Sequence, residues 1–228
     1  MALIQIKNLK KTYSDHGVET PALRGINLEI EVGEFTAIAG PSGSGKTTLL
    51  NIIGGLDRPS SGTVIVDGVD LSSMSKSALA DYRLRKVGFV FQSYNLIEVL
   101  TALENAEFVL LLQKVPRAER RARAAELLEA MGMSEYLHKR PNQLSGGQQQ
   151  RIAVARAIAH NPRIVLADEP TANLDSATAS GLLDLMRDMN ERYGVTFIFS
   201  THDRLVMEKA RRVVLLRDGL VVEDERRV

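Results

Sequence analysis

The chain has 228 residues, of which 44% are hydrophobic, and a formal net charge of +1 at pH 7. This length and composition suit one sizeable globular domain, and the small charge excludes a large basic surface for nucleic acid or anionic lipid. The absence of cysteine excludes disulfides and thiolate metal sites. Because the N-terminus lacks a signal-peptide pattern and no apolar run is long enough to span a bilayer, we expect a soluble protein.

The first predicted elements are strands. Residues 3–7, 28–32 and 63–67 alternate apolar and polar side chains, which is typical of strands exposed on one side. Asp67 and Gly68 are residues that favour a turn between strands. We therefore expect an antiparallel sheet lobe around the segment that lies between these strands.

That segment contains the motif on which the other predictions depend. Residues 40–48 fit G-x-x-x-x-G-K-[ST], the phosphate-binding pattern, and lie between an apolar run at 35–39 and an unbroken helical run at 49–53. Glycines allow successive N–H groups to turn toward a phosphate chain, and the helix start adds further donors, so a chance Gly/Ser turn is disfavoured. In this pattern Lys46 reaches the β- and γ-phosphates and Thr47 binds Mg²⁺. The predicted nucleotide-binding residues are Gly40, Pro41, Ser42, Gly43, Ser44, Gly45, Lys46, Thr47 and Thr48.

The middle of the chain is predicted to be helical. A short helix at 75–85 and a buried strand at 87–91 lead to Gln92, after which strand signals disappear. A capping box at 101–104 opens a helix to about residue 114, and a second helix covers 117–131. Its arginines lie among glutamates, which favours a solvated face over a nucleic-acid surface. We expect an all-helical lobe, 93–161, inserted into an α/β core formed by 1–92 and 162–228.

A second glycine-bearing helix start lies within this lobe. Leu144, Ser145, Gly146, Gly147 and Gln148 precede a predicted helix at 149–160. The serine and the backbone amides suit an anion, yet one chain supplies no second nucleotide. Two interpretations stay open: an ordinary N-cap, or a dimer in which this loop closes over the phosphates that the other copy holds.

The α/β pattern resumes with an apolar strand at 163–169. It ends in Asp168 and Glu169, at the edge where α/β proteins place ligands. Asp168 is a predicted Mg²⁺ partner, directly or through water. Glu169 is placed to polarise a water for attack on the γ-phosphate, the alternative being a structural acid at the strand end. A helix at 176–193, a strand at 195–200, a helix at 204–211 and strands from 213 onward complete the chain.

In this order the motifs resemble the ATP-binding subunit of an ABC transporter along the whole length of the chain. Residues 40–48 match Walker A, 144–148 the signature, 166–169 Walker B, 173–175 the D-loop and 201–203 the H-loop. Gln92 matches the Q-loop, and Tyr13, expected on the loop after the first strand, matches the aromatic A-loop. The resemblance implies an α/β P-loop NTPase core with an antiparallel β lobe and an inserted all-helical lobe.

The resemblance also implies roles for single residues. The catalytic residues would be Lys46, Gln92, Glu169 and His202, and the magnesium ligands Thr47, Gln92 and Asp168. Gln92 would contact the attacking water and sense a permease, and His202 would hold the γ-phosphate. Tyr13 would stack on adenine. Ser145, Gly146, Gly147 and Gln148 would bind the nucleotide held by the other copy.

Partners and location follow from the same resemblance. It implies ATP and Mg²⁺ as ligands, ATP hydrolysis coupled to transport, and an ATP-dependent head-to-tail homodimer. The dimer would bind an integral-membrane permease, so the protein would lie on the inner face of the cell membrane, in the cytoplasm. Nucleic acid is not an expected partner. Apolar residues in the segment 93–107 are either the docking surface for this permease or the core of the lobe.

The local sequence also resembles one subfamily. Residues 54–62, 88–92 and 95–96 are similar to macrolide-export and lipoprotein-release ATPases, whose permeases carry a large extracytoplasmic domain. Two alternatives stay open: a cell-division ATPase that works as a mechanical switch, and a non-transport ABC ATPase that acts on DNA or ribosomes. The latter usually has two ATPase copies, coiled-coil insertions or zinc cysteines, which this sequence lacks. The identity of the partner chain would distinguish a cell-division ATPase from a transport ATPase.

Overall fold

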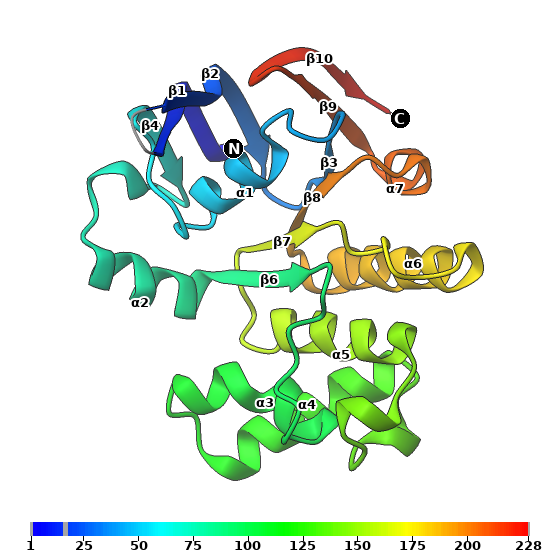
Figure 1. The fold of residues 1–228 in the computed structure, drawn as a ribbon. Helices are drawn as coiled ribbons and strands as arrows, with labels where there is room; N and C mark the ends of the chain where they lie inside the picture. The colour runs from blue at the N-terminus through cyan, green and yellow to red at the C-terminus, as the bar shows by residue number, and fades with distance from the viewer. Residues whose placement is uncertain (1, 16–17, 228) are drawn as a thin grey trace. The chain divides into compact units, whose positions relative to one another are not determined.

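The computed structural model describes residues 2–15 and 18–227, in two compact units (Figure 1). We call Met1–Arg83 with Thr196–Val228 the sheet unit, and Leu84–Val195 the helical unit. The helix α2 (Lys76–Lys86) runs across this division, after the short 3-10 turn Leu71–Ser73. The helical lobe expected at 93–161 lies within the helical unit, and its separate boundaries stay a prediction.

The sheet unit contains the predicted antiparallel sheet. Its strand order is β2-β1-β4-β5, with β1 at Ala2–Asp15, β2 at Val18–Glu31, β4 at Ser61–Val66 and β5 at Val69–Asp70. Asp67 and Gly68, with φ of 50° and 76°, form the expected turn between β4 and β5. The strands β1 and β2 are longer than predicted because residues 10–15 and 18–24 pair as a ribbon without apolar alternation.

A second group of strands in the sheet unit has two members that are buried on both faces. The strand β3 (Phe35–Ala39) pairs in parallel with β8 (Thr196–Thr201) and β9 (Arg212–Arg217), and β10 (Leu220–Arg226) is antiparallel to β9. All residues of β3 and β8 are buried, which fits a parallel sheet covered by other elements. The helices α1 (Lys46–Ile53) and α7 (Arg204–Lys209) follow β3 and β8 directly. This order places both strand-to-helix turns at one edge of the sheet.

The helical unit combines a parallel strand pair with four helices. The strands are β6 (Val87–Phe91) and β7 (Ile164–Asp168), and the helices are α3 (Ala102–Leu112), α4 (Arg117–Ala130), α5 (Gly146–Ile158) and α6 (Ser176–Tyr193). Two 3-10 turns lie at Ser134–Tyr136 and Pro141–Gln143. Thr101 and Glu104 form the predicted capping box of α3. Gly88 brings β6 close to α5, because a Cβ there would lie 2.2 Å from the Ala157 carbonyl oxygen.

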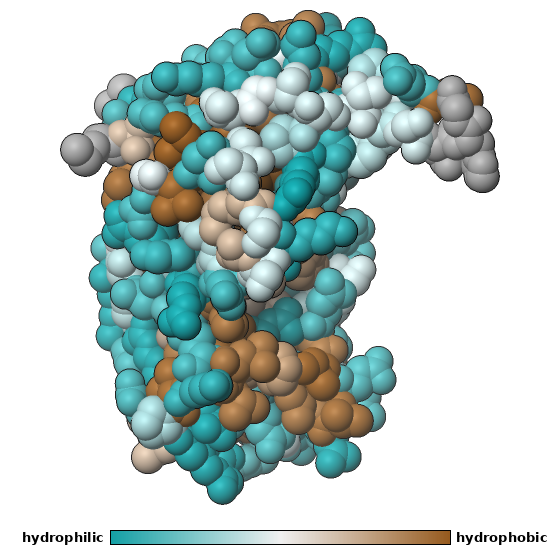
Figure 2. All heavy atoms as spheres, turned by 90° about the vertical axis from the view of Figure 1, so that its left-hand side faces the viewer, coloured by the Kyte–Doolittle hydropathy of each residue, from teal (hydrophilic) through white to brown (hydrophobic). Residues whose placement is uncertain are grey.

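Apolar side chains remain exposed on the helical unit. Val99 is 73% exposed, and Leu111 and Leu112 at the end of α3 are 45% and 52% exposed. Figure 2 shows apolar side chains gathered in the lower part of the view, at the level of α3 and α4 in Figure 1. Among the described residues, no helix is both long enough and apolar enough to cross a membrane.

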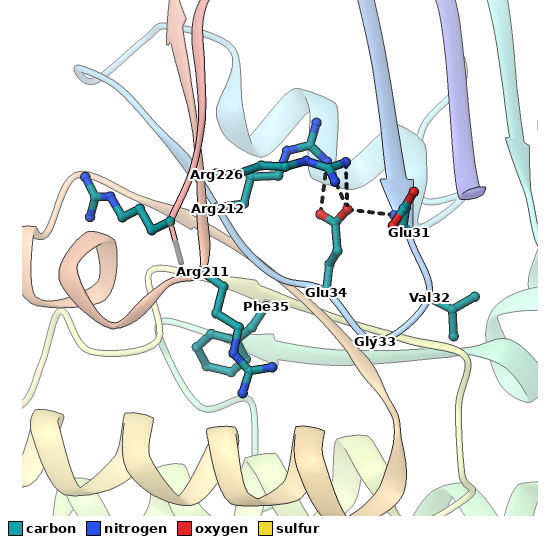
Figure 3. Close-up of a pocket in the computed structure, with 9 residues that line it drawn as sticks. Glu31, Val32, Gly33, Glu34, Phe35, Arg211, Arg212 and Arg226 are labelled. Atoms are coloured by element: carbon teal, nitrogen blue, oxygen red, sulfur yellow. Dashed lines mark hydrogen bonds and ion pairs between the residues drawn. The ribbon is translucent and has the colours of Figure 1, made fainter. Parts of the chain in front are cut away.

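A cavity of about 260 Å³ in the sheet unit lies at the N-terminal end of β3 (Figure 3). The Arg212 guanidinium beside it binds Glu34 at 2.9 Å and Asp224 at 2.7 Å, and donates to the Glu29 carbonyl oxygen. The hydrogen bonds to Asp224, opposed by burial and supported by Glu34, raise the pKa of Arg212. This cluster joins β2, β9 and β10 to the start of β3, which is the opposite end from the phosphate-binding pattern.

Candidate functional site

The loop between β3 and α1 has the backbone that a phosphate-binding loop requires. Gly40, Gly43 and Gly45 have φ of 150°, 78° and 102°, a region that side-chain-bearing residues rarely adopt. A Cβ on Gly40 would lie 2.1 Å from the Leu216 carbonyl oxygen, and one on Gly45 would lie 2.6 Å from that of Ala22. Backbone conformation therefore favours glycine at all three positions, and close approach of other backbone segments also requires it at Gly40 and Gly45.

Lys46 lies inside the curve of this loop. Its side chain is buried, with 7% of the residue exposed, and Nζ donates to the carbonyl oxygens of Gly40 and Pro41 at 2.9 Å each. An ammonium held by neutral carbonyls, at the N-terminus of an eight-residue helix, gives the loop a concentrated positive charge. Thr47 is exposed at the same helix start, and Thr48 is half-buried.

His202 emerges at the same edge of the sheet as this loop. In the parallel register Ala39 pairs with Thr201, so Gly40 and His202 each follow one of two neighbouring strand ends. The Asp203 amide donates to Thr201 Oγ1, and the Asp203 carboxylate caps α7 by accepting from the Leu205 amide. The turn that presents His202 is therefore fixed on both sides, and the imidazole itself is exposed.

Tyr13 lies on the β1–β2 ribbon of the sheet unit. Its hydroxyl donates to Asp57 Oδ2 at 2.8 Å, and the Thr48 side chain is also hydrogen-bonded to it. The Lys11 ammonium lies 4.7 Å from the ring centroid. Burial, together with the Asp57 carboxylate, raises the pKa of Tyr13. The ring is nevertheless 41% exposed, so it is held in place at the surface rather than packed in the core.

The carboxylates and the glutamine lie together in the helical unit. Phe91 pairs with Asp168 in the parallel register, so Gln92 and Glu169 follow neighbouring strand ends. Glu169 has a φ of 46°, a left-handed conformation that is uncommon for a residue with a side chain and is often found at functional sites. Gln150 on α5 donates to the Pro170 carbonyl at 2.8 Å and to that of Phe91 at 3.4 Å, and Asn173 donates to that of Gln92. These bonds connect both strand ends to one helix and its neighbouring loop.

The second glycine-bearing helix start has the geometry of an N-cap. Ser145 Oγ accepts from the Gln148 amide, and Gln148 Oε1 accepts from the Ser145 amide, which forms a capping box at α5. Ser145 is exposed. A Cβ on Gly146 would lie 2.7 Å from the Tyr94 hydroxyl, and one on Gly147 would lie 2.4 Å from Thr178 Cγ2. These glycines are fixed by close packing rather than by backbone conformation.

We expect Gly147→Ala to destabilise the helical unit by about 1–3 kcal/mol, because the new Cβ would overlap the Thr178 methyl group. Thr178→Ser removes that methyl and keeps the hydroxyl, which donates to Asp175 Oδ2 at 2.6 Å. The double variant should therefore recover most of the lost stability in urea unfolding. Equal loss in the single and double variants would mean that another contact requires the glycine.

The structure thus presents the predicted residues as two groups. The sheet unit carries Tyr13, residues 40–48 and His202, and the helical unit carries Gln92, residues 144–148, Asp168 and Glu169. Some supporting residues were missed by sequence reasoning. Asp57 and Lys11 hold Tyr13, and Gln150 connects two strand ends. The partners of Asp57 are 44 and 46 positions away in the sequence, a separation at which no spacing pattern exists.

The family model described as ABC transporter matches residues 23–172. The chain belongs to the ABC transporter family. It is 46% identical to the lipoprotein-releasing system ATP-binding protein LolD of Anaeromyxobacter dehalogenans, over 97% of this chain and 93% of that one. It is 48% identical to the macrolide export ATP-binding/permease protein MacB of Syntrophobacter fumaroxidans, over 97% of this chain but only 31% of that longer protein.

A solved ABC cassette has the same fold. The ATP-binding cassette MJ0796, in a dimeric post-hydrolysis state bound to ADP and Pi, superposes with a TM-score of 0.89 at 45% identity, over 98% of both chains. These comparisons confirm the predicted ABC ATPase fold, and this ABC protein is an ATP-binding, ATP-hydrolysing subunit of a transporter.

Proposed function

We propose that this ABC ATPase works as a head-to-tail dimer with two shared ATP sites. The observation that carries the proposal is that the chain has two glycine-bearing helix starts, at Lys46 in the sheet unit and at Ser145 in the helical unit. Each offers amide donors to an anion. In a two-fold dimer one copy supplies the first and its partner the second, so that two ATP molecules are held at the interface.

Each residue group has a distinct role in this proposal. Residues 40–48 hold the triphosphate, Tyr13 stacks on adenine, and Ser145 with Gly146, Gly147 and Gln148 contacts the nucleotide held by the other copy. Glu169 polarises the attacking water and His202 contacts the γ-phosphate. Gln92 senses the partner in the membrane. The support is their position: Tyr13 lies on the exposed β1–β2 ribbon, and the other residues follow a strand end or lie at a helix start.

The donor set also fits a magnesium ion. Thr47, Gln92 and Asp168 offer a hydroxyl, an amide carbonyl and a carboxylate, which are the hard oxygen ligands that Mg²⁺ takes beside phosphate oxygens. When bound, the ion would neutralise charge on the phosphates. The residues of the chain then position the triphosphate and the water.

We propose a permease of the macrolide-export or lipoprotein-release type as the membrane partner. The similarity to MacB and LolD, whose names describe such systems, supports this choice. Through the permease the ATPase would lie on the cytoplasmic face of the membrane. Val99, in the segment that follows Gln92, is 73% exposed and offers the permease an apolar contact. Figure 2 shows further apolar side chains in the lower part of the view.

Charged substitutions on this segment should uncouple the ATPase from the permease. Tyr94 and Leu96 are half-buried and lie next to Gln92 in sequence. We expect Leu96→Glu and Tyr94→Glu to reduce copurification with the permease and to abolish permease-stimulated hydrolysis, while ATP binding persists. Leu220→Glu, on the exposed strand β10 of the sheet unit, is the matched control. Full stimulation in both test variants would place the docking surface elsewhere.

The test of the shared sites is a mixing experiment. Lys46→Ala removes the cation from one half of each site, and Ser145→Arg obstructs the other half. Each variant alone should be nearly inactive. In a mixed dimer both lesions fall on the same site, so the second site is intact and activity should return in part.

A control is needed because Ser145→Arg also removes an N-cap, at a cost of about 0.5–2 kcal/mol. Thr101→Arg removes the equivalent capping box of α3 in the same unit and should leave hydrolysis largely intact. If mixed dimers form, and neither activity nor ATP occupancy of the second site returns, the shared-site proposal is wrong. Occupancy without activity would mean that both sites must work together.

A further inference from the structure

We propose that Asp57 and Lys11 are positioning residues for the nucleotide: they fix the Tyr13 ring before ATP arrives and so increase the affinity for the adenosine part. The inference rests on the proposed role of Tyr13 as the adenine platform. All three residues lie in the sheet unit.

Both oxygens of the Asp57 carboxylate are used. Oδ2 accepts from the Tyr13 hydroxyl at 2.8 Å, and Oδ1 accepts from Lys11 Nζ at 2.7 Å and from the Arg58 amide at 2.6 Å. Burial would raise the pKa of this carboxyl, but the hydrogen bonds from Lys11, Arg58 and Tyr13 lower it overall. Asp57 is therefore ionised near neutral pH and provides a firm acceptor for the phenol.

Lys11 fixes the ring from a second direction. Its ammonium lies 4.7 Å from the centroid of Tyr13, within the range of a cation–π interaction, and also donates to the Arg58 carbonyl oxygen. The ring is thus held at its hydroxyl and over one face. A purine would stack on the face opposite to Lys11.

Asp57 and Tyr13 are also hydrogen-bonded to α1, the helix that begins with Lys46. The amide of Asp57 donates to the Asn51 carbonyl oxygen of α1, and the Thr48 side chain of α1 is hydrogen-bonded to Tyr13. The ring and the phosphate loop are therefore connected to one short helix. This connection fixes the distance between the Tyr13 ring and the phosphate loop. A bound nucleotide must match that distance with its base and its phosphates.

Stability of the fold alone does not explain these contacts. Tyr13 is 41% exposed, and an ion pair between partly exposed side chains usually adds little to stability. Ordering a tyrosine before binding instead removes an entropic cost from the binding step. The contacts are in the right place to do this, because they restrain the exposed ring without burying it.

The test compares two ligands by calorimetry, MgATP and magnesium tripolyphosphate, on the full chain. We expect Asp57→Asn to weaken MgATP binding about 3- to 10-fold, the range for one ordered side chain. Tripolyphosphate lacks adenosine, so its affinity should change by less than about 2-fold. An equal loss for both ligands, or no loss for ATP, would overturn the proposal.

Tyr13→Phe provides a second variant that keeps the ring and removes only the hydroxyl. It should weaken ATP binding, and the double variant should lose no more than the larger of the two single losses, because both changes act on the contact between Asp57 and the Tyr13 hydroxyl. Additive losses would contradict a shared role.

The chain contains a matched control in the helical unit. There the Tyr193 hydroxyl donates to Glu126, Arg123 binds Glu126 at 3.1 Å, and Arg123 lies over the Tyr193 ring at 4.8 Å. Glu126→Gln should leave both affinities unchanged. Tyr13→Ala separates the two proposals: an unchanged ATP affinity would remove Tyr13 as the platform and both proposals about it, whereas a loss in Tyr13→Ala with none in Asp57→Asn would remove only the positioning role.

Discussion

Glu169→Gln is expected to lower ATP turnover by roughly 10²- to 10⁴-fold, the usual contribution of a positioned base, while ATP affinity is kept. The substitution preserves the size of the side chain, so the left-handed backbone at a φ of 46° carries the same constraint in both proteins. The carboxylate charge is lost, and with it the capacity to take a proton from water that our proposal assigns to Glu169. Steady-state kinetics beside a direct ATP-binding measurement would separate the two effects.

The same variant should also accumulate as an ATP-bound dimer, because ATP that is held at the proposed interface and not hydrolysed keeps the two copies together. Light scattering with and without MgATP measures this directly. Glu191→Gln, on the exposed face of α6, is the control for loss of one carboxylate and should hydrolyse ATP normally. Near-normal turnover in Glu169→Gln would leave Glu169 with a structural role at the strand end.

Local signals in the sequence predict several elements to the residue. The helix α6 covers Ser176–Tyr193 as predicted, since the Asp175 carboxylate accepts from the amides of Ala177 and Thr178, and Gly194 ends the helix at a φ of 64°. The capping box at Thr101 also begins α3 where expected, but the helix ends at Leu112, before Lys114 takes a φ of 63°. Lysine gives no sequence signal for that conformation.

The ribbon near the N-terminus could not be predicted from the alternation of apolar and polar residues. Tyr13 pairs with Thr20 and Ser14 with Glu19, and these side chains are exposed, so this part of the two strands does not alternate between apolar and polar residues. Its stability comes from backbone pairing and from contacts such as the bond between Tyr13 and Asp57. Sequence reasoning placed Tyr13 on a loop after the first strand, whereas it lies within β1.

The candidate site also contains some residues that the sequence predicts and others that it does not. Motifs identify the residues that we propose to meet the nucleotide, because phosphate chemistry fixes their type and local spacing. The residues that hold those motifs in place are joined by bonds distant in the sequence: Arg156 on α5 donates to the carbonyls of Tyr94 and Asn95, which have φ of 59° and 49°. Such bonds depend on the fold, and only the structure reveals them.

Lys46→Ala is expected to weaken ATP binding itself, by about 10- to 100-fold, the scale of one or two hydrogen bonds to a charged group. In our proposal the ammonium contacts the phosphates in the ground state and in the transition state alike, so affinity should fall together with turnover. Lys46 is also buried and donates to Gly40 and Pro41, so its loss could loosen the loop. Lys46→Met keeps a long apolar side chain and removes the charge, so it tests the effect of the charge alone.

Calorimetry with MgATP and with adenosine distinguishes the loss of the Lys46 charge from a loss of the structure of the site. Both Lys46 variants should lose ATP affinity to a similar extent, because the cation is absent from each. Their affinity for adenosine should match that of the unmodified protein, because Tyr13 and its support at Asp57 remain in place. If Lys46→Met binds ATP normally, the phosphate-loop assignment of Lys46 is wrong; if only Lys46→Ala is weakened, the stem and not the charge shapes the loop.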